Sequence, residues 1–146
     1  MKHVILLSLS LVIAACGPDL SPWKGTWSGS GSVNTGRQPS PFTGKLVIGE
    51  TFVATSDASG TPAVSFLAAL TPATADGANV TFKGPTTFEL TATPADGCTR
   101  QVTMDDGTAT RTGDALEASV RGKVKTACTG GSSTVENFLL SLVANR

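Results

Sequence analysis

The chain has 146 residues and a formal net charge of zero, from 11 basic and 11 acidic side chains. This balance argues against nucleic-acid binding, which needs a basic surface. His3 is the only histidine and tyrosine is absent, so two side chains common in acid–base catalysis and metal binding are scarce. We expect no enzyme, no metal ion and no cofactor.

Residues 1–15 have the features of a secretory signal peptide. Lys2 supplies a positive charge, an apolar run extends from Val4 to Ile13, and two alanines follow. The run is too short for a membrane-spanning helix, which needs about 20 apolar residues. The alternative is a retained amphipathic or membrane anchor.

The end of this segment, Leu11-Val12-Ile13-Ala14-Ala15-Cys16, resembles the lipobox of bacterial lipoproteins. The resemblance implies that Cys16 takes a diacylglyceryl group, that the chain is cut before it, and that the new amino terminus is acylated. In that family, an aspartate directly after the cysteine is the usual inner-membrane retention signal, but this chain has Gly17 there. The resemblance therefore implies an anchor in the cell envelope, at the outer membrane if the host has two membranes.

Residues 16–22 are short, polar and contain two prolines, so we expect them to form the acylated tether. The folded domain is then expected to cover residues 23–146.

The start of this domain, Gly25-Thr26-Trp27, resembles the first-strand motif of lipocalins, avidins and related small up-and-down barrels. The resemblance implies that Trp27 closes one end of a barrel and packs against an arginine near the final strand, here Arg146. The second lipocalin motif, a Thr-Asp-Tyr-type turn, is absent. The alternative is that Trp27 is a large core residue without this special role.

Further along the chain, glycine-containing segments predict tight turns between strands. They are Asp76-Gly77, Asp96-Gly97, Asp106-Gly107, Thr112-Gly113-Asp114 and Thr129-Gly130-Gly131-Ser132.

Between the turns, apolar and polar residues alternate, which is typical of strands with one buried face. In the clearest run, residues 116–125, we expect Leu116, Val120 and Val124 to face inward. Residues 64–70 are the one segment where a short helix competes with a strand, because Ala and Leu favour helices. Strands are expected near residues 26–33, 44–49, 51–56, 63–70, 79–83, 86–93, 99–104, 108–112, 116–125 and 134–144. The pattern predicts an all-β domain, an antiparallel up-and-down barrel or sandwich of about eight to ten strands.

Cys98 and Cys128 remain as a pair if Cys16 is acylated. Because exported proteins meet an oxidising environment, we expect these two cysteines to form a disulfide. The alternative, a metal site with two cysteines, has no histidine partner in the mature chain.

A barrel of about eight strands either holds one small ligand or is filled by its own side chains. Small residues expected on the inner face would leave volume; these are Ala68, Ala92, Ala118 and Gly122. The leading hypothesis is therefore a binding barrel for a lipid or another small apolar molecule. The side chains expected to line it are Trp27, Phe52, Phe66, Phe82 and Phe88. The alternative is that the same residues form a packed core.

Three other motifs supply no convincing catalytic site. Asp105-Asp106-Gly107 lacks the ligand spacing of a calcium loop and is expected to be a hairpin tip. Gly29-Ser30-Gly31 falls short of a nucleophile elbow. The carboxylates that a glycosidase would need are expected mostly on solvent faces or beside turns; they are Glu50, Glu89, Glu117 and Glu136.

Two alternative functions fit an exported barrel. One is an interaction protein, such as an inhibitor of a periplasmic hydrolase, that acts through the loop Arg37-Gln38-Pro39-Ser40-Pro41 or through the tail before Trp23. The other is a structural component of the envelope.

Overall fold

The computed structural model describes residues 17–36, 39–57, 63–93 and 95–146. Cys16, the expected signal peptide, and Arg37 and Gln38 of the expected interaction loop lie outside these residues. The described residues form nine strands: β1 (Gly25–Asn34), β2 (Ser40–Ile48), β3 (Phe52–Asp57), β4 (Ala63–Leu70), β5 (Pro72–Ala75), β6 (Asn79–Thr93), β7 (Cys98–Thr112), β8 (Ala115–Cys128) and β9 (Ser133–Asn145). The described residues contain no helix that is long and apolar enough to span a membrane.

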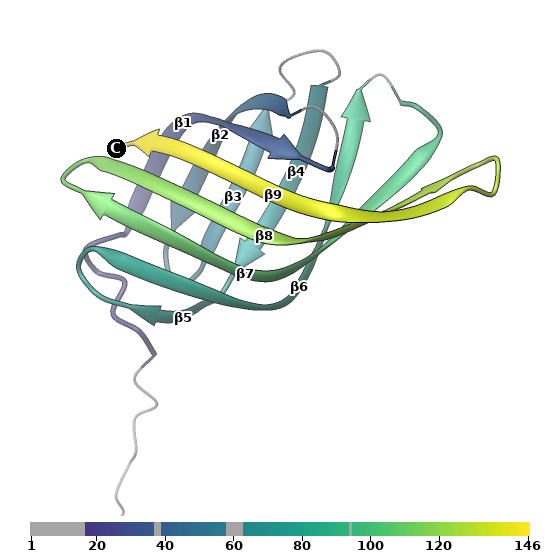
Figure 1. The fold of residues 1–146 in the computed structure, drawn as a ribbon. Helices are drawn as coiled ribbons and strands as arrows, with labels where there is room; N and C mark the ends of the chain where they lie inside the picture. Colours follow the sequence, from purple (N-terminus) through teal and green to yellow (C-terminus); the bar gives the residue numbers. More distant parts are fainter. Residues whose placement is uncertain (1–16, 37–38, 58–62, 94) are drawn as a thin grey trace, which may run out of the picture.

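Eight of these strands close into an antiparallel barrel (Figure 1). Strands that follow one another in the chain pair from β1 to β4 and from β6 to β9. β9 pairs with β1, and β4 pairs with β6, which completes the circle. The short strand β5 follows β4 directly and pairs with the first part of β6. The all-β prediction is thus confirmed, and of its two forms, barrel or sandwich, the structure is the barrel.

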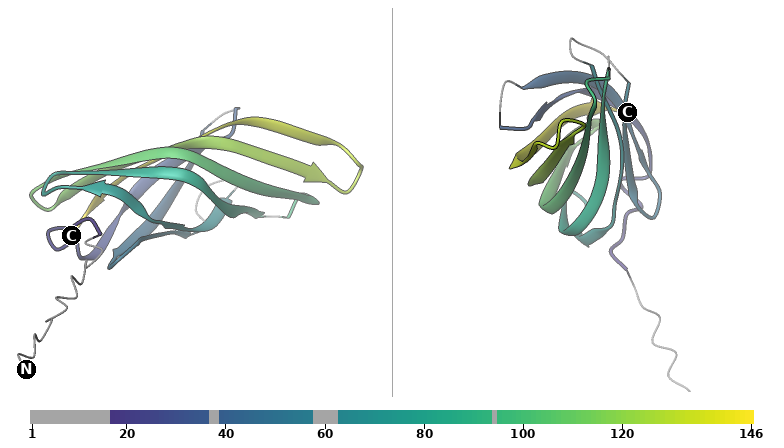
Figure 2. Two further views of the ribbon diagram at one scale, coloured as in Figure 1. Left: turned by 90° about the horizontal axis from the view of Figure 1, so that it is seen from below. Right: turned by 90° about the vertical axis from the view of Figure 1, so that its right-hand side faces the viewer.

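The two ends of the barrel differ. The end where β1 begins and β9 finishes lies next to residues 17–24 and is called the tether end, after the tether expected at residues 16–22. The opposite, distal end carries the β6–β7 and β8–β9 turns. β7 has 15 residues, and at about 3.3 Å per residue such a strand extends for about 50 Å. Figure 2 shows the β8–β9 hairpin projecting at the distal end, away from the tether.

Aromatic side chains fill the interior. Near the tether end, the Phe52 ring lies 5.9 Å from Trp23 and 5.0 Å from Phe82, measured between ring centroids. A second group extends toward the distal end, with centroid distances of 5.1 Å for Phe42–Phe66, 6.1 Å for Phe66–Phe88 and 5.8 Å for Phe88–Phe138. All six phenylalanines of the chain therefore belong to the core.

Small inward-facing residues allow neighbouring strands and rings to approach closely. A Cβ atom at Gly122 would lie 2.1 Å from the Thr103 carbonyl oxygen, and one at Gly107 would lie 3.3 Å from the Phe82 ring. Of the small residues expected on the inner face, Ala68 and Gly122 are buried, and Ala92 and Ala118 are half-buried. Glycine here permits close contact with backbone and rings.

Asp106-Gly107 is not a turn, so the predicted hairpin tip is wrong. β7 continues through this dipeptide, and Gly107 pairs with Phe82 on β6 and Val120 on β8. A bulge at Asp105 shifts the register between Met104 and Asp106. A bulge adds one residue and reverses which side chains face inward. The break in alternation is thus a bulge within one long strand.

The predictions for residues 64–70 and for four of the turns agree with the structure. Residues 64–70 form part of β4, so the strand prediction is confirmed over the helix. The Asp76-Gly77, Asp96-Gly97, Gly113 and Gly130 segments lie between strands, as predicted. β2 begins at Ser40, which places part of the expected interaction loop in a strand. β5 was not anticipated, because it is short and begins with Pro72.

Candidate binding cleft at the distal end

Two tryptophans close the tether end of the barrel. The Trp27 indole N–H donates to the Trp23 carbonyl oxygen at 3.0 Å, and the Trp23 indole N–H donates to the Asp76 carbonyl oxygen at 2.8 Å. The Arg146 guanidinium carbon lies 4.9 Å from the centroid of the Trp27 ring, and the same guanidinium donates to the Lys24 carbonyl oxygen. The expected contact between Trp27 and Arg146 is therefore present, and this end is plugged.

The five side chains expected to line a ligand site are all buried, with exposed fractions of 0 to 7%. Trp27 belongs to the plug, Phe52 packs on Phe82, and Phe66 packs on Phe88. The structure thus divides these residues between the plug and two aromatic groups. A molecule bound inside would have to separate rings that now contact each other.

A cleft opens at the distal end, where β6 and β7 diverge. Their pairing ends at Leu90 and Arg100. Beyond this point, β6 pairs with β4 through Thr91, Ala92 and Thr93, whereas β7 continues along β8 to Cys98. The gap has a volume of about 470 Å³. It is lined by Glu89, Leu90, Thr91, Ala92, Ala95, Asp96, Cys98, Thr99, Arg100, Gln101, Lys125 and Ala127.

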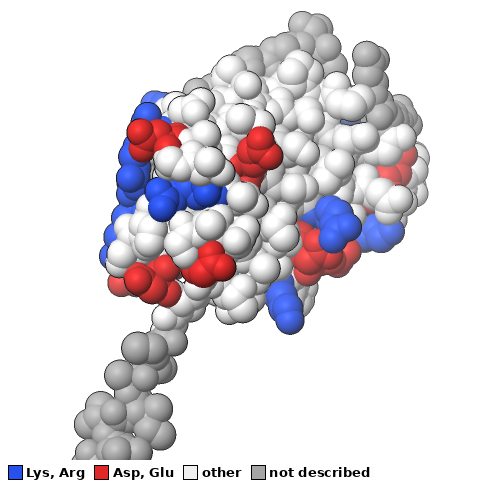
Figure 3. Space-filling model, turned by 60° about the vertical axis from the view of Figure 1, so that its left-hand side comes forward, with Lys and Arg blue, Asp and Glu red and all other residues white. Residues whose placement is uncertain are grey.

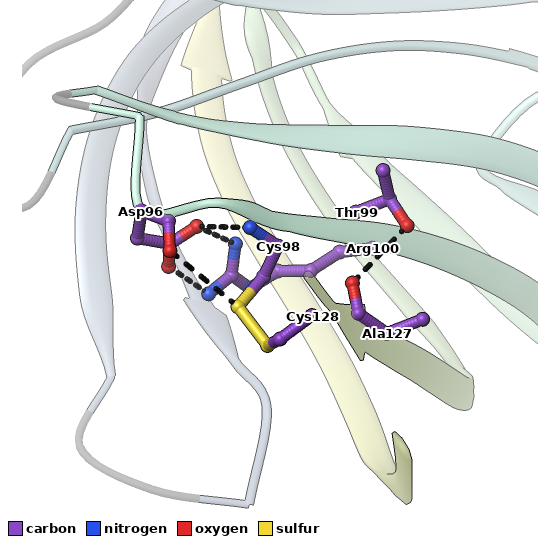
Figure 4. Close-up of a disulfide and its surroundings, with 6 residues drawn as sticks. All are labelled: Asp96, Cys98, Thr99, Arg100, Ala127 and Cys128. Carbon is purple, nitrogen blue, oxygen red and sulfur yellow. Dashed lines mark hydrogen bonds and ion pairs between the residues drawn. A yellow bond between two sulfur atoms is a disulfide. The ribbon is translucent and has the colours of Figure 1, made fainter. Parts of the chain in front are cut away.

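The predicted disulfide between Cys98 and Cys128 is present and joins β7 to β8 beside the cleft (Figure 4). The two cysteines are register partners and are 30 residues apart in the sequence. The bond therefore holds the end of β7 on β8, on the side away from β6.

Asp96 and Arg100 form an ion pair next to this disulfide (Figure 4). One guanidinium nitrogen of Arg100 donates to Asp96 Oδ1 at 3.1 Å, and the other donates to Oδ2. Asp96 Oδ1 also accepts the Cys98 backbone N–H at 3.1 Å. The hydrogen bond from Arg100 is the main reason that the pKa of Asp96 is lowered from 3.8 to about 2. The same pair raises the pKa of Arg100.

The position of Arg100 in the sequence is a signal for this site. Cys98, Arg100, Val102 and Met104 share one face of β7, and Val102 and Met104 are fully buried. Arg100 therefore occupies an inward register position at the rim, where a charged side chain needs a partner. Its partner Asp96 lies in the adjacent turn, which sequence reading treats as a turn former only.

Charges elsewhere on the surface are mixed. On the face shown in Figure 3, basic and acidic side chains lie in small groups of both signs within a mainly neutral surface. Arg121 and Asp106 form an exposed ion pair of 2.9 Å. Within the described ranges, no group of three or more histidine, cysteine or acidic residues is arranged to hold a metal ion.

A second hollow lies at the tether end, with a volume of about 710 Å³. Its walls come from residues 17–21, Lys24, and the β2–β3 and β4–β5 turns. Leu20, within the expected tether, is 6% exposed and joins the core. Residues 17–21, which follow Cys16 in the sequence, therefore lie along the plugged end.

Comparisons with known proteins do not identify a family for this chain. No family model matches the chain, and no curated protein matches it. Among solved structures, the chain is similar to the crystal structure of Rv2717c from M. tuberculosis, with 16% sequence identity and a TM-score of 0.35. The match covers 87% of this chain and 94% of that chain. A likeness this low assigns no function.

Proposed function

We propose that this protein is a lipid-anchored component of the cell envelope that binds a partner protein at the distal end of its barrel. The observation that carries the proposal is the placement of the two ends. Gly17, which follows the expected acylation site, lies at the plugged end, and the cleft between β6 and β7 lies at the other. An anchor on Cys16 would leave the cleft facing away from the membrane.

The anchor is tested by mass spectrometry and membrane fractionation. The wild-type chain, extracted from membranes, is expected to begin at Cys16 and to carry the mass of a diacylglyceryl group. Cys16→Ala is expected to remain unprocessed at this site and to lack that mass. An unmodified Cys16 in the membrane-extracted protein would contradict the anchor.

The binding surface is tested by photo-crosslinking in cells. A photoreactive amino acid replaces Thr99, which is exposed at the cleft, or Asp114, which is exposed at the tether end. We expect protein adducts from position 99 and not from position 114. Adducts that form only from position 114, or from neither position, would overturn the proposal.

A carrier for a small apolar molecule is the second candidate, favoured by the wholly apolar interior: no polar or charged residue is buried in the described chain. A fatty acid would have to open the contact between Phe66 and Phe88. Native mass spectrometry with palmitic acid distinguishes the two candidates, because a carrier retains one fatty acid per chain and Phe88→Trp reduces this binding. A chain that retains none is not a carrier.

A further inference from the structure

We propose that the cleft between β6 and β7 accepts an extended, uncharged peptide segment of a partner protein as an added β-strand. This inference rests on the proposed function, because it names what the distal end binds. It comes from the backbone at the two sides of the cleft.

The backbone of Cys98 points into the cleft. Gly97, just before β7, and Thr129, just after β8, are hydrogen-bonded to each other, with the Thr129 N–H donating to the Gly97 carbonyl oxygen at 3.0 Å. Because successive residues of a strand direct their N–H and C=O groups to opposite sides, those of Cys98 and Arg100 are directed away from β8, toward β6. The hydrogen bond from the Cys98 N–H to Asp96 agrees with this direction.

The backbone of Ala92, on β6, faces Cys98 from the other side of the cleft. Leu90 is the register partner of Arg100, so Leu90 directs its N–H and C=O toward β7, and Ala92, two residues later, does the same. Continuing the register would pair Ala92 with Cys98, but the ladder stops at Leu90. The cleft therefore presents the N–H and C=O of Ala92 and the C=O of Cys98 as strand-type hydrogen-bonding groups.

The separation of the two strands is built into the fold. β6 must pair with β4 to close the barrel, and the disulfide holds β7 on β8. Asp96 meanwhile satisfies the Cys98 N–H with a carboxylate oxygen, in the place where a neighbouring strand would offer a carbonyl. An extended peptide supplies the groups that this ladder lacks, as in other cases of strand addition.

The side chains of the cleft indicate which peptide fits. Ala92, Ala95 and Ala127 are small and leave the backbone accessible. The charged lining residues are Arg100 and Lys125 against Glu89 and Asp96, two of each sign, so the lining has no net charge. Arg100 and Asp96 already satisfy each other. A segment of small apolar or hydroxyl side chains is therefore favoured over a charged one.

The test uses peptides selected from a random heptapeptide library on the full chain and then synthesised. Each peptide is made again with single N-methyl groups that remove one backbone N–H at a time. Losing a hydrogen bond to the cleft is expected to weaken binding about ten-fold at the residues that pair with Ala92 or Cys98. Amide exchange at Ala92 should slow when the peptide binds, while that at Phe88 should not change.

Ala92→Pro removes the N–H of this residue and should weaken peptide binding at least about ten-fold. Gly77→Pro, in the turn before β6 and outside the cleft lining, is the matched control. If the proline variant fails to fold, the N-methylated peptides still decide the question. Peptides that tolerate N-methylation at every residue, or that leave exchange at Ala92 unchanged, would overturn strand addition. Crosslinks from Thr99 would then still support the proposed function, whereas their absence would remove that function as well.

Discussion

The aromatic ring of Phe42 occupies the position where a side chain at Gly31 would lie. The two residues are register partners on β2 and β1, and a Cβ atom at Gly31 would be 2.7 Å from Phe42 Cζ. The same Cβ would be 2.0 Å from the Ser141 carbonyl oxygen on β9. The glycine thus allows β1 to lie closely between its two neighbours and leaves room for the ring.

Gly31→Ala is expected to lower the free energy of unfolding by about 3 kcal/mol, because a clash with backbone cannot be relieved by side-chain rotation. Urea denaturation monitored by tryptophan fluorescence measures this change. Gly130→Ala is the control, since a Cβ atom there meets nothing within 4 Å. Equal stability of the two variants would show that β1 shifts freely, contrary to the packing described.

Removing the guanidinium that covers Trp27 should weaken the plug. Arg146→Ala loses the contact with the ring and the hydrogen bond to Lys24, and we expect a loss of about 1 kcal/mol in unfolding free energy. Lys24→Ala keeps the carbonyl acceptor and should have little effect. Indole fluorescence should also report greater water access to Trp27 in Arg146→Ala alone. An unchanged spectrum and stability would contradict the role of Arg146.

The pKa of Asp96, about 2 in the folded protein, predicts a dependence of stability on pH. The folded state binds a proton on Asp96 less tightly than the unfolded chain, whose aspartate pKa is about 3.9. The ionised pair with Arg100 therefore stabilises the fold above pH about 4, and this stabilisation is lost as the pH falls through about 2. Asp96→Asn should show a shallower decline in stability over this interval, measured by denaturation at stepped pH.

Arg100→Gln supplies the complementary measurement. Without the guanidinium, the pKa of Asp96 should return toward its ordinary value, which a carboxyl NMR titration detects directly. A midpoint that stays near 2 would mean that Arg100 is not the main cause.

The disulfide should contribute substantially to stability. For a closed loop of this length, loop-closure entropy gives roughly 3 to 4 kcal/mol. The double variant Cys98→Ala, Cys128→Ala is expected to lose about that much in denaturation measurements. Because the bond lies at the distal end, amide exchange should accelerate first around the cleft and last around Val80, which is buried near the tether end. Uniform acceleration along the strands would contradict this order.

Alternation and turn residues sufficed to predict an all-β barrel or sandwich, because most strands keep one face buried and end at glycine-containing turns. Reading β7 as two strands failed for a physical reason: the bulge at Asp105 moves the inward positions from Val102 and Met104 to Gly107 and Ala109. The expectation that small inner residues leave volume neglected that a glycine admits a ring or backbone from a neighbouring strand. Gly31 and Phe42 illustrate this.

The cleft was not predictable from local pattern, because it depends on β6 leaving β7 at one edge while its other edge pairs with β4. The pairing with β4 involves residues far apart in the sequence, such as Ser65 with Thr91. Arg100 alone offered a clue, as a charge at an inward position. The residues next to Arg100 in the sequence do not indicate that β6 separates from β7 at this point.

The pairing of β1 with β9 joins the first strand of the chain to the last, as in the register partners Ser28 and Asn145. All the other strands lie between them in the sequence. Contacts of such sequence separation form late and slowly in folding. Until β9 arrives, β1 and β8 both present unpaired edges, which are open to association with other chains. A chain of this topology is therefore open to such association during the interval between the emergence of Trp27 and the completion of the barrel.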